Sequence, residues 1–211
     1  MCESKLRRKW LTKEFNIVLA GVGGQGILLA AEVLGTAAVN EGLNVLVSEI
    51  HGMAQRGGAV VSHVRIGEKA LSPTILEGQA DMLLGFEPIE TLRNLKFASE
   101  KTIVIMNEEK ITPTELTAKQ IKYPSMKEII EKIHRLTEKL TVLDAAMLAK
   151  KAGSILAENV VLIGASAATG KLPIKNESIM KALRELVPAK HFDVNVKAFK
   201  LGYEQVKKGQ A

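Results

Sequence analysis

The residues with the clearest potential for chemistry begin with a glycine-rich run, GVGGQG at 21–26. Its glycines have the spacing G-x-G-x-x-G, and the run lies between a β-rich apolar segment at 15–20 and a helix-like apolar segment at 27–42. In this context the backbone can approach a pyrophosphate, and the helix start offers free N–H groups and the positive end of the helix dipole. The pattern predicts a phosphate-binding loop, and the alternative is a tight turn that binds no ligand. The candidate cofactor-binding residues of this run are Gly21, Gly23, Gly24, Gln25 and Gly26.

A second run, SEIHGMAQRGG at 48–58, follows directly on a predicted strand. Arg56 could hold a carboxylate or phosphate through two parallel hydrogen bonds, and His51 could transfer a proton near neutral pH. Open α/β sheets place their ligand crevice at the carboxyl ends of strands, where this loop is expected to lie. The alternative is that these side chains bond only to loop backbone while the glycines form turns. The candidate cofactor-binding residues here are His51, Gln55, Arg56, Gly57 and Gly58.

The chain lacks the residues for several other kinds of site. Cys2 is the only cysteine, so the chain can form no internal disulfide and cannot supply the thiolates of an iron–sulfur cluster. Four scattered histidines indicate no metal site, and no serine stands in a nucleophile-elbow context. The glycine-aspartate-glycine diphosphate motif of a thiamine-binding domain does not occur either. We therefore assign no catalytic residue, and any electron-carrying iron–sulfur cluster would have to reside on another chain.

Charge and hydropathy argue against nucleic-acid and membrane partners. The formal charge is +6, but residues 1–14 hold five Lys or Arg against two Glu, and residues 197–211 hold four Lys against one Glu. The rest of the chain is neutral, and an aromatic content of 4% leaves little for stacking bases. The charged N-terminus does not resemble a secretory signal, and no apolar run approaches the roughly 18 residues of a membrane span. The expectation is a cytoplasmic protein.

The elements that must position the two loops alternate as in an α/β sheet. The expected class is α/β, a Rossmann-like three-layer open sheet, mostly parallel, with a helical C-terminal part. The first two strands and the helix between them are predicted to form a parallel βαβ unit. Residues 1–13 are predicted to be a charged tail and 14–211 a single domain. Strands are predicted at 15–20, 44–50, 59–67, 80–86, 101–107 and 140–145, and helices at 27–42, 88–97, 125–137, 144–152, 155–168, 176–187 and 193–208.

Local signals refine these elements. Ser125 and Glu128 have the spacing of a capping box, Pro88 fits a first helical turn, and Asn176 is a candidate N-cap. His63 alternates with valines on its strand and is interpreted as structural. The small residues at 165–168 favour burial within the domain, with a subunit interface as the alternative.

Five motifs in order along the chain resemble the beta subunits of indolepyruvate ferredoxin oxidoreductases. The resemblance covers about residues 15–205, and it extends more distantly to the gamma subunits or domains of pyruvate and 2-oxoisovalerate ferredoxin oxidoreductases. The extension to Lys13 is outside the family pattern, and TGKLPIKNES is more charged than the family leads us to expect. The motifs are GVGGQGI at 21–27, SEIHGMAQRGG at 48–58, VSHVRIG at 61–67, ADMLLGFEPIETLR at 80–93 and DVNVKAFKLG at 193–202.

The resemblance implies a non-autonomous small subunit of an oxidoreductase that oxidatively decarboxylates 2-oxoacids. Thiamine diphosphate and iron–sulfur clusters would reside on the large (alpha) subunit, coenzyme A would take the acyl group, and electrons would pass to ferredoxin through the complex. This chain alone would bind none of those cofactors, and its two loops would line the approach of coenzyme A or substrate. The alternatives are a free-standing NAD- or FAD-dependent oxidoreductase and a purely structural assembly subunit.

Overall fold

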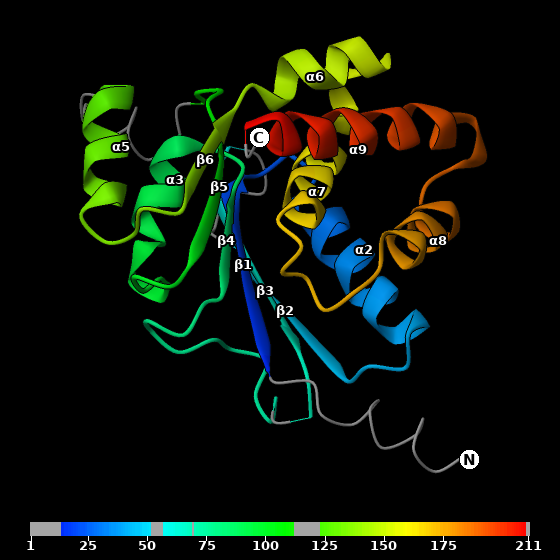
Figure 1. The fold of residues 1–211 in the computed structure, drawn as a ribbon, viewed down its shortest axis with the longest axis horizontal. Helices are drawn as coiled ribbons and strands as arrows, with labels where there is room; N and C mark the ends of the chain where they lie inside the picture. The colour runs from blue at the N-terminus through cyan, green and yellow to red at the C-terminus, as the bar shows by residue number, and fades with distance from the viewer. Residues whose placement is uncertain (1–13, 52–56, 69, 112–122, 210–211) are drawn as a thin grey trace.

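A computed structural model describes residues 14–51, 57–68, 70–111 and 123–209. The described strands form one six-stranded sheet in the order β2-β3-β1-β4-β5-β6, and helices cover both of its faces (Figure 1). The α/β class predicted from the sequence is confirmed. In chain order the elements, with η for 3-10 helices, are β1 (Phe15–Val22), α2 (Ile27–Asn40), β2 (Val45–His51), β3 (Ala59–Ile66), β4 (Met82–Gly85), α3 (Pro88–Arg93), η2 (Leu95–Phe97), β5 (Ile103–Asn107), α5 (Met126–His134), β6 (Leu140–Leu143), α6 (Ala145–Ala152), η3 (Ile155–Ala157), α7 (Glu158–Ala168), α8 (Asn176–Leu186) and α9 (Ala189–Gly209).

The sheet is mixed rather than uniformly parallel. Strands β1, β4, β5 and β6 run parallel, whereas β3 lies between β1 and β2 and is antiparallel to both. The predicted βαβ unit is corrected accordingly, because β1 and β2 point the same way but are not neighbours. The physical reason is the short connection from β2 to β3, which can only turn the chain back as a hairpin, since a parallel crossover needs a dozen or more residues.

Strand β1 is buried on both faces, which explains its continuous apolar sequence. Ile17 and Leu19 pack with residues of α2, α7 and α8, while Val18 and Ala20 pack with Ile89 of α3 and residues of α5. Figure 1 shows the same three layers, with α3 and α5 on one side of the sheet and α2, α7 and α8 on the other. The carboxyl ends of the parallel strands therefore meet at one edge between two helical layers.

The local capping signals are largely confirmed. Ser125 forms a capping box with Glu128, and Pro88 stands in the first turn of α3 after Glu87 as N-cap. The N-cap of α8 is Lys175 without a side-chain cap bond, so Asn176 is the first helical residue and its predicted capping role was wrong by one position. That error is local, because the boundary follows the backbone angles at Lys175 rather than the side-chain type.

Helices α7 and α9 cross with their backbones in contact. A Cβ atom added at Gly164 would lie 2.1 Å from the Phe199 carbonyl oxygen, and one at Gly202 would lie 2.0 Å from the Val161 carbonyl oxygen. Every residue of α7 is buried. The segment of small residues is therefore used for packing within the domain, as the sequence favoured.

Candidate functional site

The glycine loop joins the carboxyl end of β1 to the start of α2. Gly24 and Gly26 have backbone φ angles of +109° and +72°, which favour glycine at both positions. The N-cap of α2 is Gly26, and no side chain caps that helix. A Cβ at Gly24 would meet nothing within 4 Å, whereas one at Gly26 would lie 2.6 Å from Asn159 Nδ2. The loop is thus open at Gly24 and closed at Gly26.

Gln25 and Gly21 support the loop from inside. Gln25 Oε1 accepts a hydrogen bond from Val22 N, and Gln25 Nε2 donates one to Phe86 O, both at 2.8 Å. A Cβ at Gly21 would lie 2.6 Å from Phe86 Cβ. The buried Gln25 amide therefore ties the end of β1 to the end of β4. Ligand contact at these two residues stays a prediction.

The structure brings the second loop against the first. Gly23 N donates to Gly58 O at 2.8 Å, and Gly57 N donates to Gly23 O at 3.5 Å. The described end of the second predicted run, Gly57 and Gly58, therefore lies beside the glycine loop at the carboxyl edge of the sheet. The candidate residues Gln55 and Arg56 lie outside the described residues, as does the side chain of His51, whose backbone ends β2.

A buried polar cluster at the same edge was missed by sequence reasoning. Asn107, the last residue of β5, donates through Nδ2 to a carboxylate oxygen of Glu158 and accepts through Oδ1 from Ala145 N at 3.0 Å. Asn159 Nδ2 donates to Gly26 O at 3.1 Å. The cluster therefore connects β5 and the starts of α6 and α7 to the glycine loop. Its only sequence signal is the position of Asn107 at the end of a predicted strand.

The environment of the Glu158 carboxyl group favours its neutral, protonated form. The pKa of Glu158 is raised to about 8, and burial is the largest cause of the shift. The negative charge of Glu109, a hydrogen bond to Glu109 and the charge of Asp144 add to this shift. The hydrogen bond from Asn107 opposes it. Glu158 thus holds a proton within the cluster that supports the loop.

Glu87, just after β4, is a second buried carboxyl group at this edge. Its oxygens accept from Glu90 N at 2.9 Å and from the Tyr123 hydroxyl at 2.5 Å. Burial raises the pKa of Glu87, although the bonds from Tyr123 and Glu90 oppose that rise, and burial together with Glu87 raises the pKa of Tyr123. Glu87 caps α3, so we assign it a structural role.

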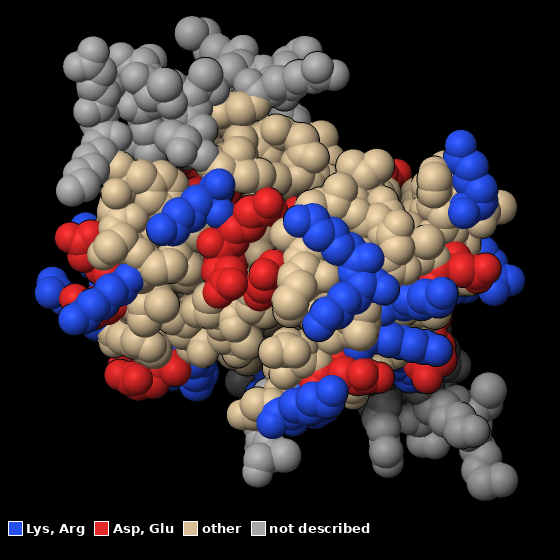
Figure 2. Space-filling view, turned by 90° about the horizontal axis from the view of Figure 1, so that it is seen from above, with Lys and Arg blue, Asp and Glu red and all other residues tan. Residues whose placement is uncertain are grey.

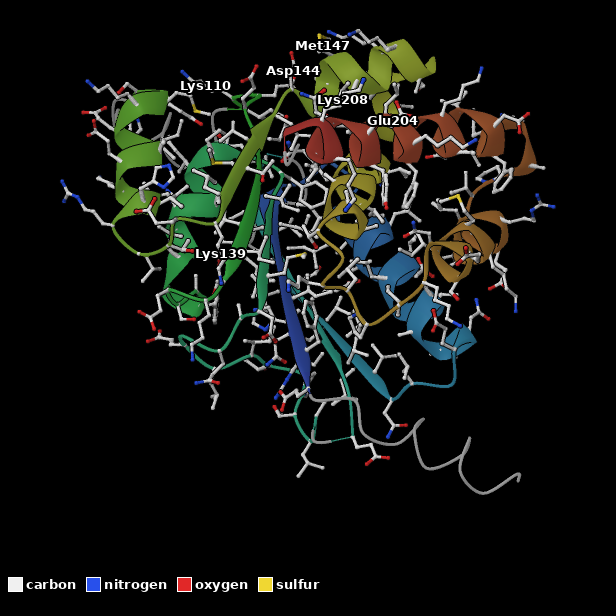
Figure 3. All side chains as sticks on the ribbon, viewed as in Figure 1. Lys110, Lys139, Asp144, Met147, Glu204 and Lys208 are labelled. Atoms are coloured by element: carbon white, nitrogen blue, oxygen red, sulfur yellow. The ribbon has the colours of Figure 1, made fainter. Side chains whose placement is uncertain are left out.

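A hollow of about 450 Å³ opens beside the cluster. Figure 2 shows Asp and Glu side chains gathered in the middle of the face seen from above, with Lys and Arg around them. In Figure 3 Asp144 and Met147 lie together at this end, while Lys139 lies farther down, before β6. The lining residues are Glu108, Glu109, Asp144, Ala146, Met147 and Lys150.

His63 lies away from this edge. It is buried on β3, and its Nδ1 accepts from Ile75 N at 3.0 Å. Burial, with the charges of Arg65 and Lys96, lowers the pKa of His63, which keeps the ring neutral. The geometry agrees with a structural role.

Other kinds of site find no support in the described part of the chain. No group of three or more His, Cys, Asp or Glu residues there could hold a metal ion, and no helix there is long and apolar enough to cross a membrane. Glu49 near the end of β2 could have matched the ribose position of a dinucleotide fold. It stands two strands from β1, because β3 intervenes, so that geometry is not reproduced.

A family model described as pyruvate ferredoxin/flavodoxin oxidoreductase matches residues 16–205. The chain belongs to this family. Indolepyruvate oxidoreductase subunit IorB of Archaeoglobus fulgidus is 45% identical over 195 residues, which are 92% of this chain and 96% of that relative. The protein of the same name in Thermococcus kodakarensis is 43% identical over 198 residues, covering 92% and 97%.

A solved structure of a related subunit has the same fold. The gamma subunit of keto/oxoacid ferredoxin oxidoreductase from Geobacter sulfurreducens matches with a TM-score of 0.67 and 25% identity. The match covers 92% of this chain and 99% of that one. The mixed sheet with its interposed β3 is therefore the fold of a known family of small oxidoreductase subunits.

Proposed function

We propose that this chain is the small subunit of an indolepyruvate:ferredoxin oxidoreductase that carries out coenzyme A-acylating oxidative decarboxylation of 2-oxoacids. The observation that carries the proposal is the 45% identity to an IorB subunit across 96% of that subunit's length. In such an assembly thiamine diphosphate and iron–sulfur clusters reside on the large subunit. The single cysteine and the lack of a thiamine motif in this sequence agree with that division.

The residues of this chain supply backbone and shape to the shared site. The carboxyl edge presents the loop at 21–26 with Gly57 and Gly58 bonded to it, and the open side at Gly24 leaves room for a phosphate group of coenzyme A. The closed side, held by Asn159 and Gln25, fixes the loop. Arg56 of the second loop is proposed to clamp a phosphate or carboxylate.

Reconstitution tests the assignment. The purified chain and the large subunit of the same organism are assayed separately and together for indolepyruvate-dependent reduction of ferredoxin. Together they should show turnover that requires coenzyme A, while this chain alone should be colourless and inactive. Stoichiometric iron or thiamine in the isolated chain, or full activity of the large subunit alone, would refute the assignment.

Arg56 has its own test in the reconstituted enzyme. A bidentate role predicts that Arg56→Lys is nearly as damaging as Arg56→Ala, because lysine keeps the charge but loses the planar fork. Unchanged turnover and unchanged coenzyme A dependence in both variants would remove the 51–58 loop from the proposed site.

A further inference from the structure

Exposed apolar side chains are found on α6 and on η3, which follows it along the chain. Leu156 is 84% exposed, Ile155 is 40% exposed, and Met147 in the first turn of α6 is 41% exposed. Leu28, in the first turn of α2, is also exposed, and the adjoining Gly26 is hydrogen-bonded to Asn159 in the first turn of α7. These residues therefore lie at the same end of the molecule as the glycine loop. Helix α6 packs against η3, and exposed apolar side chains grouped on elements that pack together are typical of interaction surfaces.

The neighbouring hollow adds a charge preference to this surface. Met147 belongs to the exposed apolar side chains and also lines the hollow. Three carboxylates, Glu108, Glu109 and Asp144, line the hollow together with one ammonium group, that of Lys150. Glu158 lies beside them as a buried carboxyl group whose pKa is raised by burial first and then by Glu109 and Asp144. A cationic side chain that enters the hollow would be attracted by three carboxylates and opposed by one ammonium group.

The combination favours a folded protein as the occupant. The phosphate groups of nucleic acid or of an anionic membrane would be repelled from the hollow by the carboxylates that line it. An apolar surface with a polar border and a charged hollow is typical of a protein–protein interface.

We propose that the large subunit of the oxidoreductase docks on this α6 face, defined by Met147, Ile155, Leu156 and the adjoining hollow. Apolar side chains of the large subunit cover Leu156 and Met147, and a Lys or Arg enters the hollow. The occupant follows from position, because a partner that brings its cofactor to the open side of the glycine loop must cover the same edge of the sheet. The inference rests on the proposed function.

The test measures the dissociation constant of the full chain for the large subunit by surface plasmon resonance. Leu156→Asp should raise it about tenfold or more, as expected for a charge placed in a buried apolar contact. The matched control is Leu76→Asp, which changes an equally apolar residue of 71% exposure just before β4, at the opposite edge of the sheet. The control should bind as the unchanged chain does.

Glu108→Lys is the second variant, and Glu77→Lys, at the opposite edge, is its control. Both positions are exposed, so neither substitution disturbs the core. Glu108→Lys should weaken binding several-fold, and the loss should shrink with added salt. Thermal unfolding of each variant separates lost binding from lost folding.

The outcomes distinguish the two levels of the argument. If the unchanged chain does not bind the large subunit, the proposed function itself fails. If it binds and both pairs of variants bind equally well, the α6 face is not the docking surface. If Leu156→Asp instead converts a dimer of the isolated chain to monomers while large-subunit binding is unchanged, the face serves a second copy and the proposal is overturned.

Discussion

The first turn and the middle of α7 are both buried, but different interactions hold them in place. Its first turn carries Glu158 and Asn159, which are committed to hydrogen bonds with Asn107 and Gly26. Its middle carries Gly164, whose backbone lies against that of α9 at Phe199. The first contact depends on protonation and hydrogen-bond geometry, and the second depends on the absence of a side chain. The comparison teaches that the helix is anchored by close packing in the middle and holds the glycine loop by its polar end.

The largest expected effect comes from filling the crossing. Gly164→Ala should lower the free energy of unfolding by about 3 kcal/mol, because its Cβ would overlap the Phe199 carbonyl oxygen, which belongs to a rigid backbone. For a domain of this size that corresponds to a fall in melting temperature of about 6–12 °C. Gly209→Ala near the end of α9, where a Cβ would meet nothing within 4 Å, is the control and should be neutral. An unchanged melting temperature in Gly164→Ala would mean that the helices can separate at little cost.

The polar end of α7 should make stability depend on pH. Folding raises the pKa of Glu158 to about 8 from an ordinary value of 4.5, so the native state binds the extra proton and stability falls as pH rises between those values. Burial lowers the pKa of His63 below its ordinary value of 6.5, so the unfolded state binds the extra proton there and the effect on stability has the opposite sign. That opposing contribution fades as pH rises above 6.5.

Urea unfolding at intervals from pH 6.5 to 8 checks this dependence. The decline should be on the order of 1–2 kcal/mol and should largely disappear in Glu158→Gln, which keeps a hydrogen-bonding group but cannot ionise. Glu108→Gln, at an exposed position, should retain it. A decline of the same size in both variants would assign it to another group.

The contact between Asn159 and Gly26 should make the effects of substitutions at these two positions on the free energy of unfolding non-additive. Gly26→Ala should cost about 2 kcal/mol, from a left-handed backbone and from the 2.6 Å approach of its Cβ to Asn159 Nδ2. In Gly26→Ala/Asn159→Ala the clash is absent, so the double variant should lose less than the sum of the single losses. Strict additivity would show that the Asn159 side chain does not lie against Gly26.

The sequence was sufficient where structure is decided locally. The capping box at Ser125 and the glycine turn between β1 and α2 follow from residue types within a few positions, and both were anticipated. The interposition of β3 was not, because a strand's pairing partner depends on distant residues, such as Val18 opposite His63.

The buried polar cluster could not be predicted from the sequence either. Nothing in LAENVV distinguishes a Glu158 that is buried and protonated from a solvated helix-end carboxylate, since burial arises only when β5 and α6 meet it. Gln25 was predicted to bind a ligand because of its place in the glycine run, yet its amide bonds both strand ends. The run therefore predicted the turn between β1 and α2, whereas ligand binding at that turn stays a prediction.

The open side of the loop gives the smallest expected change in stability and the most direct test of the account. Gly24 and Gly78 both have positive φ angles, +109° and +73°, and a Cβ at either would meet nothing within 4 Å. Alanine at each should therefore cost a similar amount, about 1 kcal/mol. Gly78 lies before β4 at the opposite edge of the sheet, which makes it the matched control.

The deciding measurement is the Michaelis constant for coenzyme A in the enzyme reconstituted with the large subunit. The account predicts that Gly24→Ala raises this constant at least several-fold, because the methyl group occupies the space left for a phosphate, while Gly78→Ala leaves it unchanged at the same loss of stability. Equal Michaelis constants in the two variants would contradict the claim that the open glycine loop lines the approach of coenzyme A.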